Sequence, residues 1–217
     1  MLRLFRVLRR ALLVALLGAC APAVGERGAI PVSDSVSVRR SQLNRWHQLG
    51  EQGITGLDRF AQTVQYVVDS RAQMNQSGRE VVVRSILDDL VDLFVGPRFH
   101  LEKSLIMSTA PVLGEDALTE QSGDLEGFAP KFQEGEGRFR HFALNAAAAY
   151  AAPDALVELA ARIRGGDMPA RSPDSVADLA TNRVGRRFTR MLREQSLSEL
   201  ADGVSVRDWL VEQFGSP

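Results

Sequence analysis

The sequence is poor in the residues that most metal and redox sites require. Its 217 residues include one cysteine, Cys20, and three histidines. A single cysteine cannot form a disulfide within the chain, and three scattered histidines without an H-E-x-x-H motif make a poor zinc site. The chain also lacks a P-loop and a G-x-S-x-G motif. We therefore expect no metal site and no bound cofactor.

Aromatic residues and net charge are also scarce. Aromatic residues make up 6% of the chain, so we expect a core of mostly aliphatic side chains and alanine. The formal charge is −1; setting aside residues 1–19, which hold four arginines and no acid, gives −5. Nucleic-acid binding usually requires a basic face, so we expect no nucleic-acid partner.

The amino terminus has the composition of a secretory signal. Four arginines lie within residues 1–10, and residues 11–19 form an apolar run. That run is too short for a membrane-spanning helix, which needs about 20 apolar residues. It ends in Leu17-Gly18-Ala19-Cys20, with small residues before the cysteine.

This ending resembles the lipobox of bacterial lipoproteins. The resemblance implies cleavage before Cys20, acyl chains such as palmitate at that cysteine, and a membrane as the partner of the lipid. It places the protein in the cell envelope, and Ala21 in place of aspartate favours the outer membrane, on its periplasmic or surface face, in a Gram-negative cell. The alternative is an ordinary secretory signal with a cysteine near its cleavage site.

Hydrophobic periodicity after the signal predicts an all-α fold. Residues 20–40 lack periodicity and predict a flexible tether, and residues 41–217 predict one orthogonal or irregular helical bundle. A glycine-rich loop is expected over 122–138, held to the core by Phe128 and Phe132. The expected helices cover residues 41–50, 57–72, 83–94, 98–109, 115–121, 138–152, 154–164, 173–194, 197–201 and 205–214.

Two of these helices carry a polar stripe beside their apolar face. His141 and Asn145 are four residues apart on the first helix. Asp178, Asn182, Gly185 and Thr189 recur at intervals of four, three and four on the second, within about 60° of arc. Gly185 and the alanines of 146–149 lack bulk, so we expect a close crossing that brings His141 and Asn145 to Asp178 and Asn182.

Two interpretations of this stripe remain open. In one, His141 is a general base oriented by Asp178, while Asn145, Asn182 and Thr189 bind a ligand. In the other, which we favour, His141 forms a polar clasp with Asp178 or Asn182 between the helices. Residues 138–194 also resemble a helical domain of uncharacterised bacterial secreted and polymorphic-toxin-like proteins, through Arg140-His141, Asn145, Asp178, Asn182 and Gly185-Arg186.

Two charged groups have simpler interpretations. We expect Asp88, Asp89 and Asp92 to form the solvated face of a helix, although three carboxylates could also bind a cation. The second charged group consists of arginines along one side of the 173–194 helix. We favour the interpretation that they balance the charge of nearby acidic residues. The alternative is that they contact phospholipid head groups or an acidic partner. These arginines are Arg183, Arg186, Arg187, Arg190 and Arg193.

The sequence thus favours an envelope lipoprotein whose helical domain is a binding or accessory module, with an envelope protein or a small ligand as its partner. The second interpretation is a lipid-anchored hydrolase that uses His141 and Asp178. The third, a toxin-like effector, depends only on the resemblance of residues 138–194.

Overall fold

The computed structural model describes residues 32–74, 78–96, 125–133, 137–152, 173–196, 199 and 205–215. All of them belong to the second of two compact units, Pro31–Pro217. The helices expected at 98–109, 115–121 and 154–164, and most of that at 197–201, lie outside the described residues. The predicted signal and the predicted lipobox with Cys20 also lie outside them.

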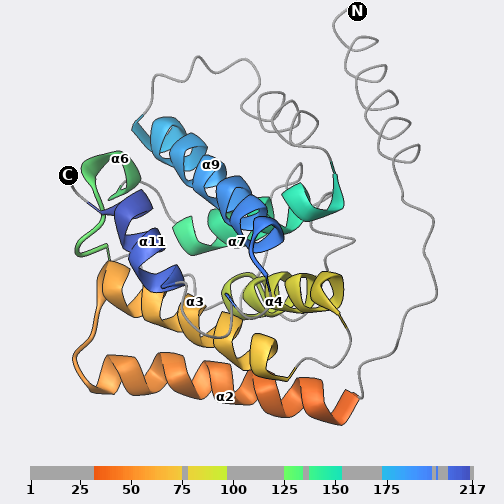
Figure 1. Ribbon diagram of the computed structural model, residues 1–217. Helices are drawn as coiled ribbons and strands as arrows, with labels where there is room; N and C mark the ends of the chain where they lie inside the picture. Colours follow the sequence, from red (N-terminus) through yellow and green to blue (C-terminus); the bar gives the residue numbers. More distant parts are fainter. Residues whose placement is uncertain are drawn as a thin grey trace, which may run out of the picture. The chain divides into compact units, whose positions relative to one another are not determined.

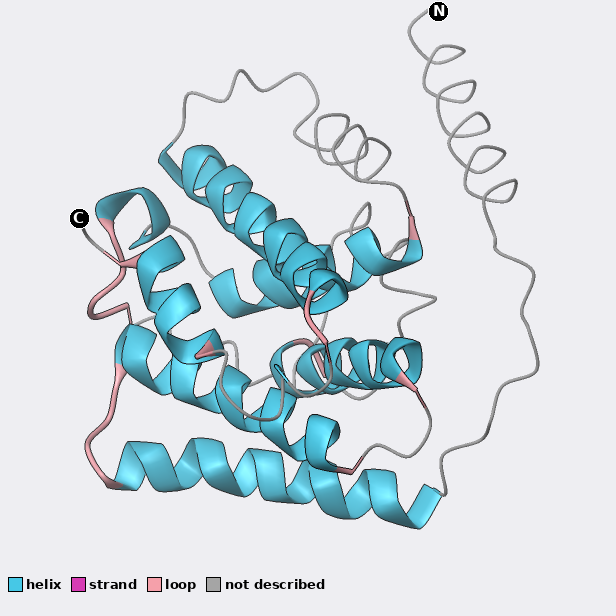
Figure 2. Cartoon of the chain, viewed as in Figure 1, coloured by secondary structure: helices cyan, strands magenta, loops and turns pink. Residues whose placement is uncertain are grey.

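The all-α fold is confirmed (Figures 1 and 2). The described residues contain seven helices and no strand; one isolated antiparallel bridge joins Phe128 to Gly215. The helices are α2 (Val32–Glu51), α3 (Gly56–Gln73), α4 (Arg79–Phe94), α6 (Pro130–Gln133), α7 (Arg138–Ala151), α9 (Pro173–Glu194) and α11 (Val206–Phe214).

The first described helix is longer than the sequence predicts. α2 begins at Val32, so the tether expected over 20–40 is wrong for residues 32–40. Its inner face continues upstream from Trp46 through Gln42 to Val38, and all three side chains are buried. The polar residue in this row hides the helical period, because Gln42 is buried although its amide is polar; it donates a hydrogen bond to Asp89.

The glycine-rich segment is attached to the core as expected. Phe128 and Phe132 are both buried, and the short helix α6 lies within this segment. The backbone N–H of Leu57 donates to the carbonyl of Glu126 at 2.9 Å, and that of Ala129 donates to the carbonyl of Phe214 at 2.8 Å. The segment therefore joins the start of α3 to the end of α11.

The centre of the core is aromatic. Most buried apolar residues are aliphatic or alanine, as expected, but Phe60 on α3 contacts five other phenylalanine rings. It stacks on Phe139 of α7 with centroids 4.5 Å apart. The other four rings are those of Phe94, Phe128, Phe142 and Phe214. Phe60 thereby links α3 to α4, α7 and α11.

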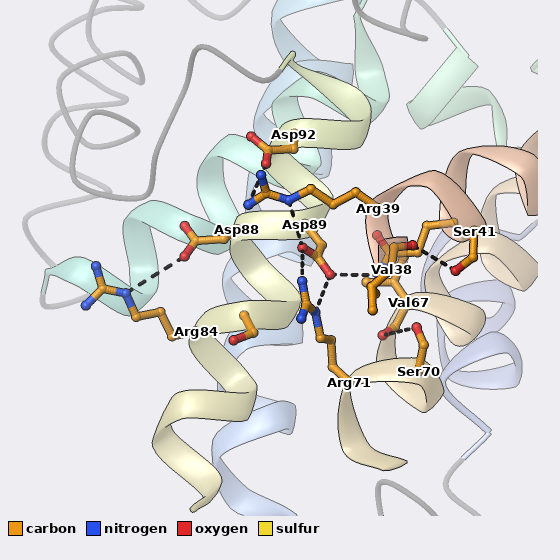
Figure 3. Close-up of polar contacts among 12 residues, drawn as sticks. Val38, Arg39, Ser41, Val67, Ser70, Arg71, Arg84, Asp88, Asp89 and Asp92 are labelled. Carbon is orange, nitrogen blue, oxygen red and sulfur yellow. Dashed lines mark hydrogen bonds and ion pairs between the residues drawn. The ribbon is translucent and has the colours of Figure 1, made fainter. Parts of the chain in front are cut away.

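A buried carboxylate joins α2, α3 and α4 (Figure 3). The side chain of Asp89 on α4 is fully buried, and Arg71 on α3 donates to both of its oxygens, at 2.5 and 2.7 Å. Gln42 on α2 donates a further hydrogen bond at 2.7 Å. Arg39 on α2 lies 3.4 Å from Asp89 and 2.8 Å from Asp92.

The prediction that Asp88, Asp89 and Asp92 form a solvated face is therefore wrong for two of these three carboxylates. The side chains of Asp89 and Asp92 are 0% and 7% exposed, whereas that of Asp88 is 27% exposed. Arginines from neighbouring helices make this burial possible, since a buried carboxylate requires a charged or hydrogen-bonding partner. The positions of these arginines could not be read from the helix that carries the acids.

We expect Asp89→Ala to lower the free energy of unfolding by about 3–5 kcal/mol, because it leaves the buried guanidinium of Arg71 without its carboxylate. Urea unfolding followed by circular dichroism measures this. The matched control is Asp88→Ala, which removes a partly exposed pair with Arg84 and should cost less than about 1 kcal/mol. Equal losses in the two variants would contradict the role of Asp89.

Candidate functional site

Helices α7 and α9 form the pair that carries the candidate site. Contacts from His141 to Asn182, from Ala146 to Thr189 and from Tyr150 to Arg193 advance along both helices together, so the two run in the same general direction. Figure 1 shows α9 lying across α7.

The close approach expected at Gly185 is present. A Cβ atom at this position would lie 2.6 Å from the carbonyl oxygen of Phe142 and 3.1 Å from the backbone nitrogen of Ala146. No side chain fits so near another helix's backbone without movement, so glycine is required here for steric reasons. Ala143, Ala146 and Ala147 on α7 are fully buried. The absence of bulk on both helices sets the distance between them.

The structure brings together four of the candidate polar residues. Nδ1 of His141 lies 3.3 Å from Oδ1 of Asn182, and Nε2 lies 3.6 Å from Oδ1 of Asp178. Nδ2 of Asn145 donates to the same Asn182 oxygen at 2.7 Å and to the backbone carbonyl of His141 at 3.0 Å. We call His141, Asn145, Asp178 and Asn182 the polar row.

The hydrogen bonds of the polar row have a fixed direction. The carbonyl of His141 can only accept, so the atom of Asn145 facing it is the amide nitrogen. That nitrogen also donates to Asn182, whose facing atom is therefore an oxygen. Nδ1 of His141 faces this same oxygen and must carry a proton to bond with it. Nε2 faces a carboxylate, so both ring nitrogens of His141 point at acceptors.

Solvent reaches one end of the polar row. The side chains of His141 and Asp178 are 24% and 34% exposed, whereas Asn145 and Asn182 are buried. The buried amides position the imidazole from within the helix pair, and the carboxylate meets it from the exposed end. Such a row can hold two helices together, and its exposed end is in contact with solvent.

Thr189 lies outside the polar row. Its hydroxyl donates to the backbone carbonyl of Ala146 at 2.6 Å. Thr181, which is not among the candidate residues, is fully buried and its hydroxyl makes no hydrogen bond to a described residue. No sequence signal marks Thr181, because a threonine among apolar helix positions resembles an ordinary core residue.

A second contact closes the far end of the pair. The guanidinium of Arg193 on α9 lies 4.7 Å from the ring centroid of Tyr150 on α7 and donates to the carbonyl of Tyr150 at 3.0 Å. The Tyr150 hydroxyl donates to the carbonyl of Glu80 on α4. Burial, followed by its contact with Glu80, raises the pKa of Tyr150, so the phenol stays a neutral donor at physiological pH.

No group of three or more histidine, cysteine or acidic side chains among the described residues is arranged to hold a metal ion. None of the described helices is both long and apolar enough to cross a membrane.

Comparison with known proteins adds no family. No protein-family model matches the chain, and neither a curated protein nor a solved structure shows detectable similarity to it.

We expect Gly185→Ala to destabilise the protein by about 1–3 kcal/mol, because the added methyl group meets the α7 backbone. Alanine would otherwise favour a helix by about 1 kcal/mol over glycine, so the sign of the change is diagnostic. Thermal and urea unfolding measure it. The control is Arg183→Ala on the exposed side of α9, which should change stability by less than about 0.5 kcal/mol. A stabilised Gly185→Ala variant would contradict the close approach.

Proposed function

We propose that this protein is an envelope lipoprotein, anchored by lipid on Cys20, whose helical domain is a binding or accessory module. The Leu17-Gly18-Ala19-Cys20 motif after a basic and apolar leader supports the anchor. Two or three acyl chains on one cysteine provide durable attachment, whereas one chain binds only marginally.

The orientation of both ring nitrogens of His141 toward acceptors carries the choice of an accessory module over an enzyme. A histidine that acts as a general base needs one nitrogen lone pair directed at the substrate. Here Nδ1 faces Asn182 and Nε2 faces Asp178. This geometry favours a clasp between α7 and α9, which leaves the domain's surface for a partner in the envelope.

The anchor is tested by mass spectrometry of the mature amino terminus and by membrane fractionation. We expect an acylated Cys20 as the first residue, and we expect Cys20→Ser to move the protein out of the membrane fraction. Ala21→Ser, the same kind of change at the adjacent position, should leave the protein in the membrane. An unmodified mature amino terminus at another residue would contradict the proposal.

A second candidate function is a lipid-anchored hydrolase. The observation that favours it is the partial exposure of His141 and Asp178 at the solvent end of the polar row, with 3.6 Å between Nε2 and Oδ1. If Asp178 moved aside when a substrate bound, Nε2 would become available as the base. Asn145 and Asn182 would then hold the ring in place through Nδ1.

The two functions differ in the effect of His141→Ala and His141→Gln. If the domain is an accessory module, both variants lower the free energy of unfolding. Binding to the partner then falls only as far as the fraction of folded protein falls. The hydrolase predicts that an ester or amide substrate is cleaved by the native chain and that both variants abolish this while native helicity remains. The second result would overturn the accessory module.

A further inference from the structure

The outer face of α9 concentrates positive charge. Six of its described side chains are exposed, and four of these are arginines. The other two are Val176 and Glu194, which is the only acidic residue among these six. We call Arg183, Arg187, Arg190 and Arg193 the arginine face.

Helical geometry places these arginines in one band. Positions 183, 187 and 190 fall within about 60° of arc, and 193 borders them on one side. Over ten residues the band extends about 15 Å along the helix axis. Arg187 hydrogen-bonds the neutral side chain of Gln213 at 3.2 Å, and this contact does not compensate the charge of its guanidinium. Arg193 lies 4.0 Å from the carboxylate of Glu80, and this exposed pair offsets part of its charge.

The chain before α2 limits how far the domain can lie from its anchor. α2 begins at Val32, twelve residues after Cys20. A fully extended chain gains at most about 3.6 Å per residue, so this connection spans no more than about 43 Å. If Cys20 carries the lipid, the start of α2 stays within that distance of the bilayer.

The length of this connection allows the arginine face to meet the membrane. α4 contacts both α2 and α9, and packed helix axes lie about 8–10 Å apart, so the axes of α2 and α9 are at most about 20 Å apart where α4 contacts both. A connection of up to about 43 Å is longer than this. A lipid at Cys20 therefore does not prevent the arginine face from meeting the same bilayer.

We infer that the arginine face docks on anionic phospholipid head groups of the membrane that holds the Cys20 lipid. This inference depends on the proposed lipid anchor. Guanidinium groups pair with phosphates through parallel N–H donors, and basic residues near an anionic bilayer add to its affinity. The anchor keeps the face close to the head groups, so even weak contacts are populated.

Arginine modification in proteoliposomes tests the inference. The lipidated full-length protein is placed in two kinds of vesicle. The anionic vesicles contain phosphatidylethanolamine and phosphatidylglycerol, and in the neutral vesicles phosphatidylcholine replaces the phosphatidylglycerol. Both samples are treated with phenylglyoxal. Peptide mass spectrometry then measures the modification of each arginine. We expect at least about threefold slower modification of Arg183, Arg187 and Arg190 in the anionic vesicles alone, and loss of that difference in 0.5 M salt.

Arg40, which is exposed on α2, is the internal control and should react equally in both vesicles. Equal reactivity of the arginine face in both vesicles would overturn docking, and would be the result if this face met an acidic protein instead. Protection of Arg40 in place of the α9 arginines would also overturn it, because α2 would then face the bilayer.

A charge-matched pair of variants gives a second readout. Arg183→Gln with Arg187→Gln should reduce binding of the unlipidated Cys20→Ser chain to anionic vesicles by about fivefold per arginine. Arg40→Gln with Arg45→Gln changes the net charge equally and should have little effect; equal losses would overturn the inference. Failure of the anchor would appear separately, as absence of the native protein from neutral vesicles.

Discussion

The contact at Gly185 is the constraint on which the candidate site depends. A Cβ atom there would lie 2.6 Å from the carbonyl oxygen of Phe142, so the two helices approach backbone to backbone. At that separation the short side chains of Asn145 and Asn182 meet directly. A wider separation would put water between these amides and release the ring of His141. One missing side chain thus sets the geometry of the whole polar row.

Much of this arrangement could be predicted from the sequence. The 3.6-residue period located α3, α4, α7 and α9, and the spacing of His141, Asn145, Asp178 and Asn182 predicted that they would meet. These features are local, because they depend on the face of a helix and on residue size. The start of the helix predicted over 205–214 is also local, because the hydroxyl of Ser205 accepts from the backbone N–H of Asp208.

Features that depend on distant partners could not be predicted. The sequence predicts a solvated Asp89, yet Arg71 from α3 and Gln42 from α2 surround it. Within residues 32–40, which lack an apolar period, Arg39 pairs with Asp89 and Asp92 on α4. Thr189 was assigned to a ligand site because it shares the stripe, but its hydroxyl bonds the α7 backbone. The polar stripe correctly predicted that α7 and α9 face each other. It did not determine which atoms of the two helices form hydrogen bonds.

The protonation of His141 tests the central claim, that the polar row is a clasp with a fixed hydrogen-bond direction. Two-bond proton–nitrogen NMR correlations of the histidine rings report which nitrogen is protonated, and the signal lost in His141→Gln gives the assignment. The account predicts a proton on Nδ1, donated to Asn182. A neutral ring with its proton on Nε2 alone would contradict it, because Nδ1 would then place a lone pair against the Asn182 oxygen.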